Sequence, residues 1–402
     1  MAAGDMQRSP AGGQALEVLG AATRLGLTSF GGPVAHLGYF REEYVARRRW
    51  LSDRAFADLV ALCQFLPGPA SSQAGIAIGL MRAGYPGSLL AWIGFTLPSV
   101  VLLVLFAWGV GGVLEQQWLD GLRIAAVAVV AYAVLGMARM LTPDTERLVL
   151  AIAAAVLVLS WTTPGAQVVA IAAGGLVGWR FLVTEPPPPD EGRGFGGSRR
   201  VAVVSLGLFA FLLAVLPILS SVTASATLDV VDGFYRAGSL LFGGGHVILP
   251  LLESEVVQPG WVSPDEFVNG YGAAQAVPGP LLSFAAYLGF VMNVGPGGVA
   301  GAALATAAIF LPSFLLIFGA LPFWHSLRAR PGAQAALAGV NAAVVGLLLA
   351  ALYDPVWTSA IFDAADFALA LGAFGLLAVL RLPAWFVVLT TGLVGAAMVE
   401  WG

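Results

Sequence analysis

Long apolar runs constrain this chain more than any other feature of its sequence. A helix needs about 20 apolar residues to cross a bilayer, and runs of roughly this length recur along the 402 residues. Only 10% of the residues are charged, against about 25% in a soluble domain. We therefore expect an all-α polytopic membrane protein with about nine full spans, at residues 88–113, 118–141, 148–161, 166–183, 201–222, 299–323, 335–353, 362–380 and 383–399.

Four further apolar runs are interrupted near their middle. Proline lacks a backbone N–H and clashes inside a helix, and paired glycines weaken one. Each run should therefore form two half-helices, as a re-entrant hairpin or a discontinuous helix. The interruptions are Gly31-Gly32-Pro33 in residues 15–40, Pro67-Gly68-Pro69 in 55–81, Gly243-Gly244-Gly245 in 228–252, and Pro278-Gly279-Pro280 in 266–291.

The two halves of the chain resemble each other at a nearly constant offset, between 210 and 214 positions. Ordered matches at one offset indicate an internal duplication. The matched elements are Phe30-Gly31-Gly32 with Phe242-Gly243-Gly244, Trp50 and Ser52 with Trp261 and Ser263, Gln64 with Gln275, the two Pro-Gly-Pro elements, Pro86-Gly87 with Pro296-Gly297, and Leu97-Pro98-Ser99 with Leu311-Pro312-Ser313.

Arginines indicate how the halves are oriented. The loop after the first Gly-Gly element holds Arg41, Arg47, Arg48, Arg49 and Arg54, whereas the matching second loop holds no arginine. By the positive-inside rule the first loop and the N-terminus are cytoplasmic, and the second half is inverted. Arg123 is the one arginine expected near an outer helix end.

The chain divides accordingly into five parts. We expect a cytoplasmic tail (1–14), an N-terminal repeat (15–183), a cytoplasmic Pro- and Gly-rich linker (184–200), a helix that inverts the second repeat (201–227), and a C-terminal repeat (228–402).

This architecture indicates a secondary transporter. Inverted repeats with paired discontinuous helices hold substrate near the bilayer midplane, and a half-helix N-terminus favours an anion through its free N–H groups and partial positive charge. The alternative is that the Pro and Gly residues only kink helices for packing.

Matched charged residues are further candidates. Arg24 and Arg236 lie in apolar runs 212 positions apart, and a guanidinium suits oxyanions. Alternatively, each could extend its charge toward the membrane surface. Glu17 and Asp229, each seven residues earlier, are expected to be partners of these arginines or proton carriers.

Polar residues near the interruptions complete the candidate site. His36 and His246 could bind the anion or gate by protonation, or could be structural. Ser72 and Ser283 follow the Pro-Gly-Pro elements, with Ser71 and Gln73 beside the first, and could bind an anion or cap a helix. Gln64 and Gln275 are amides in apolar runs, where a partner is required.

Several function classes are excluded by what the sequence lacks. Cys63 is the only cysteine, so neither a disulfide nor a thiolate metal site can form. We find no metal-spaced cluster, nucleophile motif or phosphate loop, and expect neither an enzyme nor a cofactor. The net charge of −4 is too diffuse to indicate a nucleic-acid partner.

The motifs named above, from residues 30–36 and 242–250 to the two Pro-Gly-Pro elements, resemble the chromate ion transporter family in its long two-domain form, over about residues 15–401. The resemblance implies export of chromate across a prokaryotic inner membrane and chromate resistance, driven by an ion gradient or the membrane potential. Sulfate, also a tetrahedral dianion, stays open as substrate, as do uptake, a channel, and a scaffold or sensor without flux. A homodimer is also left open.

Overall fold

The computed structural model describes residues 11–30, 32–110, 116–161, 164–183, 198–242, 248–324 and 330–401, and these residues form no β-strand. The first helices are α1 (Ala11–Thr28), α2 (Gly32–Phe40), η1 (Arg41–Arg47), α3 (Asp53–Phe65), α4 (Ala70–Val110), α5 (Gln116–Leu141), α6 (Thr145–Ser160) and α7 (Pro164–Phe181). Next come α8 (Arg199–Thr223), α9 (Ala226–Ser239), α10 (Ile248–Leu252), η3 (Glu253–Val257), α11 (Pro264–Ala276), η4 (Leu281–Ser283) and α12 (Phe284–Val291). The last are α13 (Gly298–Ala320), η5 (Leu321–Phe323), α15 (Pro331–Ala351), η6 (Leu352–Trp357), α16 (Ala364–Ala378) and α17 (Ala384–Trp401).

The expected all-α membrane architecture is confirmed. Within the described ranges, five helices are long and apolar enough to cross a membrane: Ala70–Gly109, Asp120–Leu141, Arg199–Thr223, Gly298–Phe323 and Pro331–Trp357. The other four expected spans are the shorter helices α6, α7, α16 and α17, of 15 to 18 residues. Asp144 and Asp363 cap α6 and α16 through their side chains, so α6 begins before its expected start at residue 148 and α16 begins after its expected start at residue 362.

The two Pro-Gly-Pro elements break their helices as expected. α3 ends at Phe65 and α4 begins at Ala70, with residues 67–69 between them; we call this the first break. α11 ends at Ala276 and η4 begins after residues 278–280, the second break. The central glycines have φ of +124° at Gly68 and +98° at Gly279, a region that residues with a Cβ rarely adopt. The sequence thus places both breaks correctly.

The Gly-rich elements also separate helices. α1 ends at Thr28 and α2 begins at Gly32, so the chain is interrupted just before the first element. In the second half α9 ends at Ser239 and α10 begins at Ile248. Gly31 and residues 243–247, including His246, lie outside the described residues.

Matched serines start the helix that precedes each break. The Ser52 side chain accepts a hydrogen bond from Ala55 N–H at the start of α3. Ser263 and Glu266 form a reciprocal capping box at the start of α11. The sequence match between Ser52 and Ser263 therefore corresponds to the same local structure.

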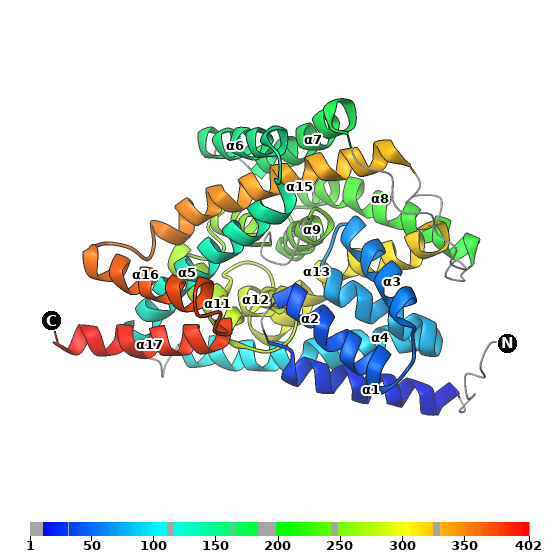
Figure 1. Ribbon diagram of the computed structural model, residues 1–402, viewed down its shortest axis with the longest axis horizontal. Coiled ribbons are helices and arrows are strands. Elements are labelled where there is room, and N and C mark those ends of the chain that lie inside the picture. Colours follow the sequence, from blue (N-terminus) through cyan, green and yellow to red (C-terminus); the bar gives the residue numbers. More distant parts are fainter. Residues whose placement is uncertain are drawn as a thin grey trace.

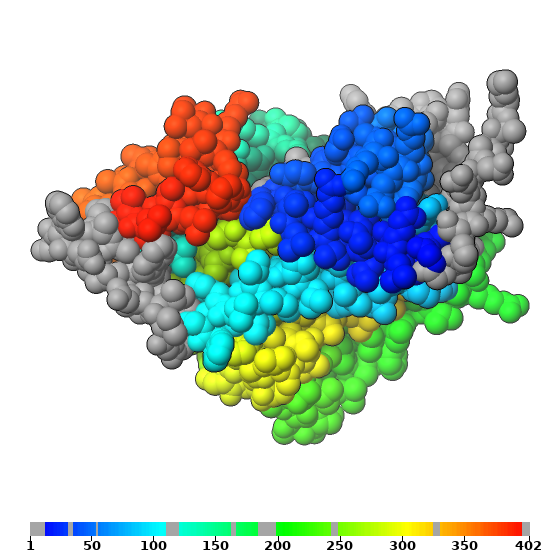
Figure 2. Space-filling view, turned by 90° about the horizontal axis from the view of Figure 1, so that it is seen from below, coloured from blue at the N-terminus to red at the C-terminus, as the bar shows by residue number. Residues whose placement is uncertain are grey.

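The helices surround a central group of short elements (Figure 1). α1 and α17 lie along the lower edge, α6 and α7 along the upper edge, and α9, α11 and α12 lie between them (Figure 1). Figure 2 shows a hollow between the blue N-terminal helices and the red C-terminal helices, with yellow-green atoms of the segment that contains α11 inside it. The segment that contains α11 therefore lies where the N-terminal helices face the C-terminal helices.

Close backbone contact fixes α1 against α4. A Cβ on Gly26 would lie 2.6 Å from Gly94 O and 2.7 Å from Phe95 O, and a Cβ on Gly94 would lie 2.8 Å from Thr23 N. A second face of α1 is open, because a Cβ on Gly20 would meet no atom within 4 Å. Small residues of this kind let membrane helices approach closely.

A partly buried carboxyl, that of Glu253, lies in η3, outside the five long spans. Burial and the neighbouring carboxylate of Asp354 raise the pKa of Glu253 from its ordinary value of 4.5 to about 7, although a hydrogen bond with Gln258 opposes this shift. Between these two values the folded protein binds more protons than the unfolded chain. Rising pH should therefore lower stability in this interval.

We predict that Gly26→Ala destabilises the protein by about 1–3 kcal/mol, because the new methyl group overpacks the contact between α1 and α4. Gly20→Ala on the same helix should be neutral or stabilising, since alanine favours helix and space is available there. Thermal unfolding in detergent measures both; equal midpoints for the two variants would contradict the close contact.

We also predict that the midpoint temperature of unfolding decreases as the pH rises from about 4.5 to about 7, and that Glu253→Gln reduces this decrease because it removes the ionisation of a partly buried carboxyl. Glu42→Gln, which changes an exposed carboxylate on η1, is the control and should keep the pH dependence of the parent protein. An unchanged slope in Glu253→Gln would show that Glu253 does not titrate in this range.

Candidate functional site

The two breaks are held crosswise between the halves of the chain. Gly68 N–H in the first break donates to Leu241 O at 2.5 Å, and Gly279 N–H in the second break donates to Ser29 O at 2.9 Å. Ser29 and Leu241 are matched residues, each directly before the Phe of a Gly-rich element. Each half therefore binds the break of the other half through the same backbone groups.

Matched serines approach the breaks from the Leu-Pro-Ser elements. Ser99 Oγ donates to Pro278 O at 2.6 Å, so it contacts the second break. Ser313 Oγ lies 3.1 Å from the position that a Cβ on Gly68 would take, so it lies beside the first break. Both contacts again cross between the halves.

Several buried hydroxyls around the breaks lack a hydrogen-bond partner among the described residues. They are Ser29, Ser72, Thr96, Ser283 and Ser313, all less than 5% exposed. An unpaired buried polar group costs about 1–3 kcal/mol, and native proteins contain few of them. Such a concentration of unpaired hydroxyls near the two breaks indicates a site for a polar ligand.

Two of these hydroxyls occupy the first turn after a break. Ser72 is the third residue after Pro69, and Ser283 is the third residue after Pro280. The N–H groups at a helix start have no partner inside the helix, and the end carries a partial positive charge. The sequence selected both serines, and the structure buries both next to a helix start.

Gln73 belongs to the same cluster, although the sequence analysis gave it no role of its own. Its side chain is fully buried, Nε2 donates to Pro67 O at 2.6 Å, and Oε1 has no partner within the described part of the chain. A signal was present, since the matching position holds Phe284, 211 positions later. The two halves therefore differ at this position of the site.

His36 lies buried beside the first helix start. Its Nδ1 is 3.3 Å from Ser71 Oγ, and its ring meets the Phe95 ring edge-on with centroids 5.5 Å apart. The matching position in the second half holds Ile248. Among the described residues, the first half alone brings an imidazole to this region.

The predicted glutamines are placed differently from each other. Gln64, at the end of α3, is exposed, so the structure does not bring it into the buried cluster. Gln275 is half-buried, and its Nε2 lacks a partner in the described ranges. The requirement for a partner therefore applies to Gln275 alone.

The two candidate arginines are bound by carboxylates. Arg24 lies 3.5 Å from Glu43, and its side chain is 55% exposed. Arg236 makes two hydrogen bonds to Glu255, at 2.8 and 2.5 Å, and an ion pair with Asp232 at 3.0 Å. Glu43 and Glu255 are matched residues 212 positions apart. Arg236, which two carboxylates bind, is a poor ligand for a second anion, whereas Arg24 shares the single carboxylate of Glu43 with Arg47 and Arg48.

The expected partnership of Glu17 with Arg24, and of Asp229 with Arg236, is wrong. Glu17 pairs with Arg48 at 3.3 Å and Arg82 at 2.9 Å, and Asp229 accepts a hydrogen bond from Ser220. A spacing of seven residues puts two side chains on one helix face but two turns apart, beyond the reach of the neighbouring positions that pair on a helix.

The ionic groups of the two halves differ in charge. Glu43 contacts Arg24, Arg47 at 3.1 Å and Arg48 at 2.6 Å, whereas Arg236 is bound by two carboxylates. The first group therefore has an excess of positive charge and the second an excess of negative charge.

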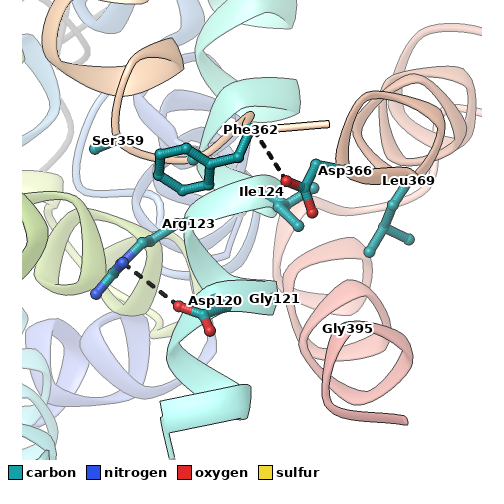
Figure 3. A pocket seen from close by; sticks show the side chains of 10 residues that line it. Asp120, Gly121, Arg123, Ile124, Ser359, Phe362, Asp366, Leu369 and Gly395 are labelled. Carbon is teal, nitrogen blue, oxygen red and sulfur yellow. Dashed lines mark hydrogen bonds and ion pairs between the residues drawn. The ribbon is translucent and has the colours of Figure 1, made fainter. Parts of the chain in front are cut away.

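Arg123, itself buried, forms a separate polar network, of which Figure 3 shows the pair with Asp120. Its Nε donates to Asn269 Oδ1 at 2.8 Å, and Nη1 lies 3.4 Å from Asp120 and 3.5 Å from Asp265. It lines a cavity of about 180 Å³ between α5, α16 and α17. Because Asp265 and Asn269 lie on α11, the network ties α5 to the helix that precedes the second break.

A family model and several known proteins match this chain over most of its length. The family model described as chromate transporter matches residues 16–179 and 228–396. The chromate transport protein of Pseudomonas aeruginosa is 31% identical over 355 residues, which cover 82% of this chain and 78% of that protein. The probable chromate transport protein of Synechococcus elongatus is 27% identical over 334 residues, covering 82% and 81%.

A third relative, the chromate transport protein of Cupriavidus metallidurans, is 28% identical over 337 residues, covering 82% of this chain and 79% of that protein. No solved structure matches the chain. The family model covers most of the chain in two segments that each contain one Pro-Gly-Pro break. This protein belongs to the chromate transporter family.

Proposed function

We propose that this protein exports chromate from the cell and holds the dianion between the two helix starts that follow the breaks. The observation that carries the proposal is the pair of buried, unpartnered hydroxyls of Ser72 and Ser283 at matched positions in these helix starts. Hydroxyl and backbone N–H donors there can surround a tetrahedral oxyanion. The names of the relatives supply chromate as the substrate.

Neutral donors suit a carrier better than free arginines. A transported ion must bind well enough to enter and weakly enough to leave. Helix ends and hydroxyls provide partial charges, whereas Arg24 and Arg236 are already engaged with Glu43 and Glu255. In this proposal the arginines stabilise the half-helices, and the ligand meets the cluster around residues 72 and 283.

We further propose that residues 15–183 and 228–402 are inverted repeats, joined by the cytoplasmic linker 184–200 and the helix region 201–227. The crosswise hydrogen bonds of Gly68 and Gly279 support a two-fold relation, because they join equivalent groups in both directions. The arginine-rich loop of the first half supports its cytoplasmic position.

The membrane potential gives a physical reason for export. An elementary charge gains about 2.3 kcal/mol per 100 mV, so a dianion leaving a cell with a negative interior gains about 4.6 kcal/mol per 100 mV. Uptake of the same ion would need a coupled cation to overcome this term. Sulfate has the same shape and charge as chromate and is the second candidate substrate.

Substitution of the two hydroxyls tests this site. We expect Ser72→Ala and Ser283→Ala each to raise the half-saturating chromate concentration about tenfold in proteoliposome flux, because a hydrogen bond to a charged group is worth about 1.5–3 kcal/mol. Ser88→Ala is the matched control: Ser88 is buried on α4 and its hydroxyl bonds Tyr85 O in its own helix.

The same assay separates the candidate substrates and the direction. Export predicts that flux from the side of the Arg41–Arg47 segment accelerates when that side is made electrically negative, and competition by excess sulfate measures selectivity. Unchanged chromate affinity in both serine variants would reject this site. Flux of sulfate in proteoliposomes that show no chromate flux would assign the protein to sulfate instead.

A further inference from the structure

The carbonyl groups of the two breaks are bound in two different ways. Pro278 O in the second break accepts from Ser99 Oγ of the other half at 2.6 Å. The matching Pro67 O in the first break accepts from Gln73 Nε2 of its own half at 2.6 Å. Ser313, which matches Ser99, is fully buried and has no partner for its hydroxyl among the described residues. The crosswise contact of Ser99 with Pro278 O is thus formed, whereas the equivalent contact of Ser313 with Pro67 O is not.

The helix starts that follow the two breaks also differ from each other. After the first break the chain enters α4 directly at Ala70, whereas after the second break a 3-10 turn, Leu281–Ser283, precedes α12. Equivalent sequence elements therefore adopt two local conformations within one molecule. In a transporter built from inverted repeats, one repeat moves against the other around a fixed site, so the two conformations are expected to exchange between halves.

We propose that Ser99 and Ser313 are positioning residues that bind the break of the opposite half in alternate states of the transport cycle. In the present state Ser99 holds Pro278 O. In the other state Ser313 holds Pro67 O, Gln73 releases it, and the contact of Ser99 opens. The proposal rests on the proposed function, since the two states are those that open the anion site to opposite sides.

The geometry around the breaks permits this exchange. Ser313 Oγ already lies next to Gly68, at 3.1 Å from the position of a Cβ on that residue. A Cβ on Gly279 would collide with Ser99 Oγ, and would lie 3.4 Å from Gly26 O. Glycine at both positions therefore leaves the room in which a serine of the opposite half reaches a break carbonyl.

Gln73 makes the exchange depend on the ligand. Its amide lies in the first turn after the first break, next to Ser72, and its Oε1 lacks a partner in the described part of the chain. An oxyanion at this helix start offers Nε2 an acceptor in place of Pro67 O. Binding of the anion would then free Pro67 O for Ser313.

The experiment measures to which side the site opens, without any substrate. In a Cys63→Ala background, Ser72→Cys serves as reporter, and a membrane-impermeant anionic thiol reagent is applied to oriented proteoliposomes from one side or the other. The readout is the ratio of the two labelling rates. Ser99→Ala should shift this ratio at least threefold in one direction, because it weakens the present state, and Ser313→Ala should shift it in the opposite direction.

Two further variants separate exchange from a general structural effect. The double variant Ser99→Ala with Ser313→Ala should return the ratio toward the starting value, since each state loses one hydrogen bond. Gln73→Ala should shift the ratio in the same direction as Ser99→Ala, because it releases Pro67 O, and it keeps the test available if a serine variant does not fold. Ser239→Ala is the control: this buried serine bonds Tyr235 O within its own helix, and the ratio should not move.

Shifts in the same direction for Ser99→Ala and Ser313→Ala, or no shift in either one, would overturn the exchange. The labelling ratio does not depend on which anion is carried. If chromate flux were insensitive to Ser72→Ala while the labelling ratio shifted as expected, the proposed substrate site would fail and the exchange would stand.

Discussion

The crosswise hydrogen bonds of Gly68 and Gly279 are the constraint on which the rest of this structure depends. Each joins a break in one half to the backbone just before the Gly-rich element of the other half. A broken helix in a membrane leaves N–H and C=O groups that neither lipid nor the helix itself can satisfy, so protein must supply their partners. Here each half supplies a backbone acceptor for the central glycine of the other half's break.

This constraint also explains where polar groups gather. Serines from the Leu-Pro-Ser elements reach the breaks because the helices that carry them pack across the same junction. The close contact of Gly26 with Gly94 and Phe95 brings α1 near this junction, where Gly26 O lies beside the second break. Hydroxyls that would be costly in lipid are thus concentrated where helix starts and a bound anion can pair them.

The sequence predicts local events well and contacts between halves poorly. Pro67 to Pro69 and Pro278 to Pro280 must interrupt a helix whatever surrounds them, so both breaks were placed correctly. The partners of Arg24 and Arg236 were not, because Glu43 and Glu255 reach them from segments that follow the Gly-rich elements. Gln73 was named beside the first Pro-Gly-Pro element, but its contact with Pro67 O and its difference from the matching Phe284 were not predicted.

The unequal residues at matched positions have a common physical effect. Gln73 against Phe284, and His36 against Ile248, put donors in the first half where the second half has apolar side chains. The ionic group around Glu43 likewise has surplus arginine, while Arg236 is surrounded by acids. In the proposed orientation a dianion would approach through the positive, polar half and leave past the negative one. The duplicated sequence would then provide a junction with two equivalent states. The residues that differ between the halves would set the direction of transport, because an anion is attracted to the first charge group and repelled by the second.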